Sequence, residues 1–72
     1  MKKVFKLQNL ECAHCASKME EGIGKLEGVE NVRVNFLTQK LTLEADEQIF
    51  TSLLEEAAKI IRKIEPDCSI IR

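Results

Sequence analysis

The chain contains no tryptophan and no tyrosine, and it has only three phenylalanines, one proline and one histidine. It therefore lacks interleaved basic and aromatic residues on which nucleic-acid bases stack. A formal net charge of −1 gives no electrostatic attraction to nucleic acid or to an anionic membrane. No apolar run approaches the roughly 20 residues of a membrane span, and no apolar segment follows the first lysines as in a signal peptide. We expect a cytoplasmic protein that binds no nucleic acid and does not insert into a membrane.

Catalytic patterns are also missing. With a single histidine, the chain offers no set of nucleophile, base and orienting residue, and no glycine loop is suited to cradle a phosphate. We therefore do not expect an enzyme.

What is present is ordinary globular composition in 72 residues, of which 44 % are hydrophobic and 32 % are charged. This apolar fraction is too high for a disordered tail, and the length allows one domain, which we place at residues 1–72. We expect it to be monomeric. A domain this small buries only roughly 60 % of its unfolded surface, so its core must be efficient or held by a metal or disulfide.

Hydrophobic periodicity predicts six elements. Alternation with period two predicts strands around Phe5–Leu7, Val32–Phe36 and Leu41–Glu44, and a short last strand over Cys68–Ile71. The first helix carries Met19, Ile23 and Leu26 on one face and ends at Gly28, although Ser17 with Glu20 also fits a later start through a capping box. The second helix begins at Asp46 as N-cap and ends before Pro66, with one apolar face formed by Ile49 or Phe50, Leu53, Ala57, Ile60 and Ile64.

The order strand, helix, strand, strand, helix, strand predicts an α+β fold of ferredoxin-like βαββαβ type. A four-stranded antiparallel sheet with two helices on one face would bury both apolar stripes. In this topology the last strand lies antiparallel to the first. Its beginning, with Glu65, Asp67 and Cys68, therefore lies towards the loop that follows the first strand.

That loop carries the most informative motif, Cys12-Ala13-His14-Cys15. Two cysteines at this spacing can direct both sulfurs at one soft metal ion such as Zn(II), Cd(II) or Cu(I). Cys15 falls at the start of the first helix, where we expect the helix dipole to lower its pKa, and Cys12 lies in the preceding loop. Because no second close Cys or His pair exists, a four-ligand zinc finger is excluded, and a site with open positions suits capture and transfer.

Two other interpretations of the pair stay open. Thiol–disulfide exchange is one, although the aromatic and proline residues usual around a redox pair are missing. Two incidental core cysteines are the other, although a loop between a strand and a helix is a poor place to bury both.

The chain resembles the heavy-metal-associated domain, which occurs in soft-metal P-type ATPases and in small copper chaperones. The family's Gly-Met-x-Cys-x-x-Cys loop corresponds to residues 9–15, followed by Ala16. The Gly-Val turn after the first helix appears as Gly28-Val29, and the Val-Asn of the second strand as Val34-Asn35. The resemblance covers nearly the whole chain and implies both the ferredoxin-like fold and metal binding through Cys12 and Cys15.

Two departures from the family pattern bear on the metal. Asn9 replaces the usual Gly and Leu10 the usual Met, and Leu10, like the stretch 64–67, is more similar to the cadmium and zinc ATPase branch. The resemblance implies the N-terminal module of a P-type ATPase that exports Zn, Cd or Pb. Its partners would be the membrane and ATPase portions of the same polypeptide, or another metal-binding domain. The alternative is a free-standing copper-type metallochaperone.

Three further residues are candidate ligands. Glu11, directly before the first cysteine, offers a carboxylate that suits Zn²⁺, Cd²⁺ or Pb²⁺ and adds little for Cu⁺, so we predict the ligand set Cys12, Cys15 and Glu11. The competing interpretation makes Glu11 a solvated loop residue. We expect Cys68 to be a buried core residue and His14 to face solvent, with ligation as the alternative for each.

Overall fold

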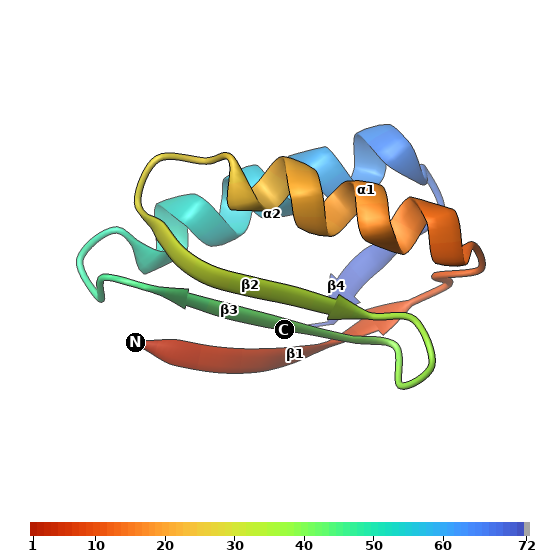
Figure 1. Cartoon of the computed structure of the whole chain (residues 1–72), viewed down its shortest axis with the longest axis horizontal. Coiled ribbons are helices and arrows are strands. Elements are labelled where there is room, and N and C mark those ends of the chain that lie inside the picture. The colour runs from red at the N-terminus through yellow and green to blue at the C-terminus, as the bar shows by residue number, and fades with distance from the viewer. Residues whose placement is uncertain (72) are drawn as a thin grey trace.

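Six elements follow one another in the predicted order (Figure 1). The computed structural model describes residues 1–71. The elements are β1 (Lys2–Gln8), α1 (Ala13–Gly24), β2 (Val29–Asn35), β3 (Lys40–Ala45), α2 (Phe50–Ile64) and β4 (Ser69–Ile71). Within residues 1–71, no helix is long and apolar enough to cross a bilayer.

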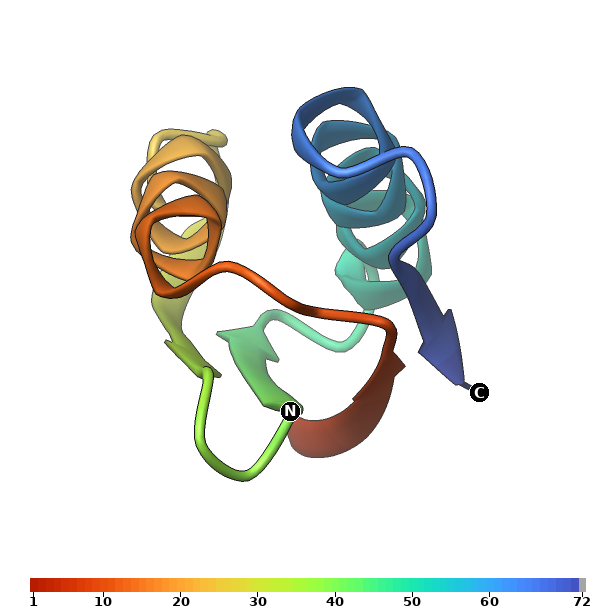
Figure 2. The ribbon, with the colours of Figure 1, turned by 90° about the vertical axis from the view of Figure 1, so that its right-hand side faces the viewer.

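The strands form one antiparallel sheet in the order β2-β3-β1-β4, and both helices cover the same face (Figure 2). This is the predicted ferredoxin-like arrangement, and it is confirmed. Gln8 at the end of β1 pairs with Ser69 at the start of β4. The segment between α2 and β4 therefore lies beside the loop that follows β1, as the strand order predicted.

The core lies between the sheet and the two helices. Each helix contributes an apolar stripe, and the ring centroids of Phe5 from β1 and Phe50 from α2 lie 6.2 Å apart. The largest fully buried side chains are Leu7, Leu10, Met19, Ile23, Leu41, Leu43, Ile61 and Cys68. Leu10 lies in the cysteine loop and Cys68 in the neighbouring connection between α2 and β4, so the core extends under that loop.

The predicted end of the first helix was wrong by four residues. Helix α1 ends at Gly24 with Lys25 as its C-cap, so Leu26 lies beyond the helix, although it still packs against the core. Gly28 has a φ of +100°, which suits glycine, but it stands in the connection to β2. The late start through a Ser17–Glu20 capping box is also wrong, because Cys12 caps the helix and the Glu20 carboxylate accepts the Val34 N–H at 2.7 Å.

Asp46 was predicted as the N-cap of the second helix, and this was wrong. The N-cap of α2 is Ile49, which provides no side-chain hydrogen bond. Asp46 instead forms a turn of its own, in which its carboxylate accepts the Gln48 N–H at 2.9 Å and its carbonyl accepts the Ile49 N–H at 3.1 Å. The side chain competes for local backbone donors one turn before the helix begins.

Candidate metal centre

The two cysteines occupy defined positions at the start of α1. Cys12 is the N-cap, with extended backbone at φ −132° and ψ 118°, and Cys15 stands in the first turn. The Cys12 sulfur accepts the backbone N–H of Cys15 at 3.3 Å, and the Cys12 carbonyl accepts the N–H of Ala16 at 3.0 Å. Both cysteine side chains are half-buried and unbridged. The loop thus places one sulfur just before the helix and the other on it, as predicted.

A carboxylate from the far end of the chain completes the group. Glu65 is the C-cap of α2, with extended backbone held by a 2.8 Å hydrogen bond from its N–H to the Ile61 carbonyl. A carboxylate oxygen of Glu65 and the sulfurs of Cys12 and Cys15 all lie within 4.8 Å of one another. Because Zn–S and Zn–O bonds are about 2.0–2.3 Å long, three atoms at this separation can hold one ion with a small inward movement.

The electrostatics of the two thiols differ from the prediction for Cys15. The pKa of Cys12 is lowered, chiefly because the side chain and then the backbone N–H of Cys15 hydrogen-bond to its sulfur. The pKa of Cys15 is raised to about 11, first by its hydrogen bond to Cys12, then by desolvation and by negative charge at Cys12 and Glu65. The expectation that the helix start lowers the pKa of Cys15 was wrong, because the hydrogen bond to Cys12 and desolvation raise it.

The other candidate residues lie apart from this group of three. Glu11 and His14 are both exposed, and neither belongs to the cluster formed by the two sulfurs and the Glu65 carboxylate. Asp67 approaches the loop through its backbone, where its carbonyl accepts a hydrogen bond from the Asn9 side chain at 3.3 Å. Cys68 is 1 % exposed, and desolvation, followed by the charge of Glu65, raises its pKa. The expectation that Cys68 is a core residue is confirmed.

Two residues fix the loop, Asn9, which the sequence analysis named only as a replacement for the family's Gly, and Gln39, which it did not single out. Asn9 has a φ of +63° and Gln39 a φ of +56°, both in the left-handed region. Asn9 reaches Asp67, and the Gln39 side chain bonds to both backbone polar groups of Leu10. Only the strand order could have pointed to Gln39 from the sequence. The start of β3 lies beside the end of β1, so a long polar side chain just before β3 can reach the loop.

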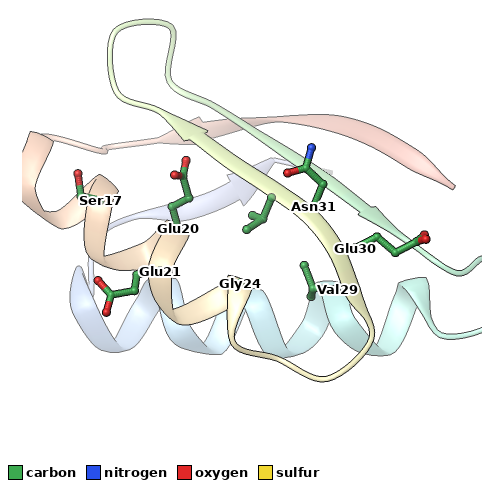
Figure 3. Close-up of a pocket in the computed structure, with 8 residues that line it drawn as sticks. Ser17, Glu20, Glu21, Gly24, Val29, Glu30 and Asn31 are labelled. Carbon is green, nitrogen blue, oxygen red and sulfur yellow. The ribbon is translucent and has the colours of Figure 1, made fainter.

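A separate hollow lies between α1 and β2 (Figure 3). Its lining includes Glu20, Glu21 and Glu30, of which Glu21 also pairs with Lys25 at 3.3 Å on the helix surface. None of the residues that line it belongs to the group of Cys12, Cys15 and Glu65. The hollow is therefore distinct from the candidate metal centre.

Two relatives show what kinds of protein resemble this chain. It is 35 % identical over 66 residues to a cadmium, zinc and cobalt-transporting ATPase of Helicobacter pylori. That match covers 92 % of this chain but only 9 % of the ATPase. The chain is also 34 % identical over 47 residues to the copper chaperone CopZ of Enterococcus hirae, which covers 65 % of this chain and 68 % of that protein.

The fold has close solved counterparts. The CsoZ metallochaperone superposes with a TM-score of 0.77 at 18 % identity, covering 100 % of this chain and 97 % of the other. Residues 4–69 match the heavy-metal-associated domain, and this span includes both cysteines and Glu65. With the family match, the fold and the paired cysteines in agreement, the chain belongs to the heavy-metal-associated domain family.

Proposed function

We propose that this heavy-metal-associated domain carries a divalent soft ion, Zn(II), Cd(II) or Pb(II), held by Cys12, Cys15 and the Glu65 carboxylate. Its general role is metal binding and transfer, and the domain itself is not a catalyst. The observation that carries the proposal is the Glu65 oxygen within 4.8 Å of both sulfurs. The two-thiolate centre leaves coordination positions open, so thiolates from a partner can enter before the first pair leaves.

The carboxylate favours a divalent cargo for reasons of charge and of ligand type. Two thiolates and one carboxylate bring three negative charges, of which a divalent ion neutralises more than Cu(I) does. Oxygen is an acceptable ligand for Zn(II), whereas Cu(I) is satisfied by two nearly linear thiolates. The match to the cadmium, zinc and cobalt-transporting ATPase, 35 % identical over 92 % of this chain, supports the same choice.

We further propose that the domain is the N-terminal module of a P-type ATPase that exports these ions, on the cytoplasmic side of the membrane. The chain spans about a tenth of the length of the ATPases it matches. The match to CopZ, which has about the size of one such domain, favours a free-standing copper chaperone as the second candidate. A reading frame that continues into membrane spans and an ATPase core would decide for the module.

The test of metal choice compares two glutamates. Glu65→Gln should weaken Zn(II) and Cd(II) binding about 10-fold or more, within the range seen for groups that support a metal. Cu(I) affinity should change less than about twofold, since the carboxylate is not needed for a linear dithiolate. Competition titrations with a chromophoric chelator for each ion measure both affinities.

Glu11→Gln is the matched control, because it removes an equal charge from the cysteine loop, at a residue outside the cluster. A loss of Zn(II) affinity in Glu11→Gln and not in Glu65→Gln would make Glu11 the carboxylate ligand, as the sequence alone predicted. Equal losses for Zn(II) and Cu(I), or no loss for Zn(II) in either variant, would overturn the divalent cargo and favour the copper chaperone.

The cysteine requirement has its own test. Replacing both Cys12 and Cys15 by Ser should abolish Cd–thiolate absorbance while the fold persists, since the fully buried core lies elsewhere. Unchanged absorbance in the double variant would contradict the ligand assignment. If the wild-type dithiol bound no metal but showed the reduction potential of a redox pair, thiol–disulfide exchange would replace the proposal.

A further inference from the structure

Gln39 makes an unusual set of contacts for a residue in a hairpin turn. Its side-chain oxygen accepts the Leu10 N–H at 3.0 Å, and its side-chain nitrogen donates to the Leu10 carbonyl. The same nitrogen donates to the Phe36 carbonyl at 3.0 Å, within its own hairpin. One half-buried amide side chain therefore satisfies both backbone polar groups of Leu10 and is itself held in place.

The hydrogen bonds of Gln39 begin where the backbone pairing of β1 with β3 ends. The register of β1 with β3 ends at the pair Lys6–Lys40, and the Leu7 N–H then donates to the Gln39 carbonyl at 2.7 Å. Leu10 has no strand partner, yet it is only 2 % exposed. Buried backbone groups without a hydrogen-bond partner cost free energy. The Gln39 side-chain amide provides the donor and the acceptor that a neighbouring strand would otherwise provide for Leu10.

The tether lies two residues before the first metal ligand. Cys15 stands in the first turn of helix α1, whereas Cys12 is its N-cap, held by the N–H groups of Cys15 and Ala16 on one side and joined to the loop on the other. On its other side the loop is tied to the segment that carries Glu65, through the 3.3 Å bond from Asn9 to the Asp67 carbonyl. The path by which the backbone reaches Cys12 is thus held from the hairpin at Leu10, while the helix holds Cys12 itself.

We propose that Gln39 is a positioning residue of the metal centre, whose amide holds Leu10 so that the Cys12 sulfur faces Cys15 and Glu65. The inference builds on the proposed function, because it assumes metal binding at these residues. A preorganised site binds more tightly and releases its ion more slowly than one whose loop must order on binding. Gln39 therefore sets the rate at which the domain passes on its metal, without touching the ion.

Gln39→Gly tests this with little backbone strain, because glycine adopts the positive φ of this position readily. We expect Cd(II) affinity to fall about 10-fold, as for other supporting groups, and Cd(II) transfer to a competing chelator to accelerate by a similar factor. Thr38→Gly is the matched control, since it adds the same backbone freedom to the same turn without removing a contact to Leu10. It should change both quantities less than about twofold.

A second control separates positioning from general stability. Leu43→Val reduces packing in the middle of the sheet and should lower stability without changing Cd(II) affinity or transfer. If Leu43→Val or Thr38→Gly produced the losses expected for Gln39→Gly, or if Gln39→Gly produced none, the proposal would be overturned. Cd(II) binding by the wild-type protein in the same titration tests the proposed metal centre separately. If the wild type binds Cd(II), such a result would overturn only the role of Gln39 and not the metal centre.

The wild-type chain provides a test that needs no folded variant. Among residues 9–12, which lie outside the strands and helices, the Leu10 amide should be strongly protected from hydrogen exchange. An NMR exchange experiment on the metal-free protein measures this directly. A Leu10 amide that exchanges as fast as that of exposed Glu11 would overturn the proposed tether.

Discussion

The Cys15 backbone N–H donates to the Cys12 sulfur at 3.3 Å, so the backbone at one cysteine stabilises negative charge on the thiol of the other. The bond has the geometry of a helix N-cap, with sulfur in the place usually taken by a serine or aspartate oxygen. The two thiols are chemically unequal before any metal arrives. Hydrogen bonds from the side chain and then the backbone of Cys15 lower the pKa of Cys12, whereas the side-chain hydrogen bond to Cys12 and desolvation raise the pKa of Cys15 to about 11.

This asymmetry predicts the order of alkylation. The thiolate is the reactive form, and with a pKa of about 11 Cys15 is only about 0.1 % thiolate at pH 8. In the metal-free, reduced protein, iodoacetamide should modify Cys12 at least about 10-fold faster than Cys15, as followed by mass spectrometry of peptides. Cys68 is the internal control and should react only in denaturant, since it is buried. Faster modification of Cys15 would contradict the lowered pKa of Cys12 and the raised pKa of Cys15.

The same pKa values predict how metal affinity depends on pH. Metal ions bind the thiolates, so binding releases the protons that the metal-free thiols still carry. Between the lowered pKa of Cys12 and the pKa of about 11 of Cys15, only Cys15 holds a proton. Zn(II) affinity should therefore rise about 10-fold per pH unit in that window, and about 100-fold per unit below the pKa of Cys12.

Calorimetric titrations in buffers of different ionisation enthalpy count the released protons directly. Release of about two protons per Zn(II) ion across the whole range up to pH 9 would show that Cys12 stays protonated and would contradict the prediction.

The strand order made Glu65 predictable as a neighbour of the loop, but not as the carboxylate nearest the sulfurs. Antiparallel pairing of β1 with β4 follows from the order of elements, and it brings residues 65–68 beside the cysteine loop. Which of Glu11, Glu65 and Asp67 faces the sulfurs depends on backbone dihedrals at the end of α2, where Glu65 is extended. Sequence patterns report burial and periodicity, and they carry little information on such dihedrals.

Gln39 illustrates the same limit. Its function in the fold follows from a φ of +56°, which turns its amide towards Leu10, and no pattern in the sequence distinguishes that conformation from an ordinary turn. Asp46 shows the opposite error, since it has the right residue type for an N-cap but forms a preceding turn. The positions of Cys12 and Cys15 were predictable because helix start and cysteine spacing are both local in the sequence.

Asn9 is the second left-handed residue, and substitutions there should separate backbone strain from side-chain bonding. Its φ of +63° costs a residue with a Cβ about 1–2 kcal/mol, except that asparagine tolerates the region better than most. Asn9→Val should lower the free energy of unfolding by about 2 kcal/mol, because a β-branched side chain fits this conformation worst. Urea denaturation measures the change.

Asn9→Gly is the informative comparison, since it relieves the backbone and removes only the 3.3 Å bond to the Asp67 carbonyl. Its stability should stay within about 0.5 kcal/mol of wild type, because that bond is exposed. Equal destabilisation by glycine and valine would mean that the side-chain bond, not the backbone conformation, explains the asparagine.

Cys68 has a thiol that metal ions favour, yet it lies in the core and outside the group formed by Cys12, Cys15 and Glu65. Cys68→Ala should lower the free energy of unfolding by about 1 kcal/mol through lost packing, as measured by urea denaturation. Its Zn(II) and Cd(II) affinities should remain within about twofold of wild type, since no ligand is removed. Cys68→Ser is the comparison that keeps the volume and buries a hydroxyl, so it should destabilise the fold more without weakening the metal centre.

A loss of metal affinity above tenfold in a folded Cys68→Ala variant would identify Cys68 as a third sulfur ligand. The connection between α2 and β4 would then have to move Cys68 out of the core on binding, and the Cys68 amide of the wild-type chain would lose its protection from hydrogen exchange when cadmium is added.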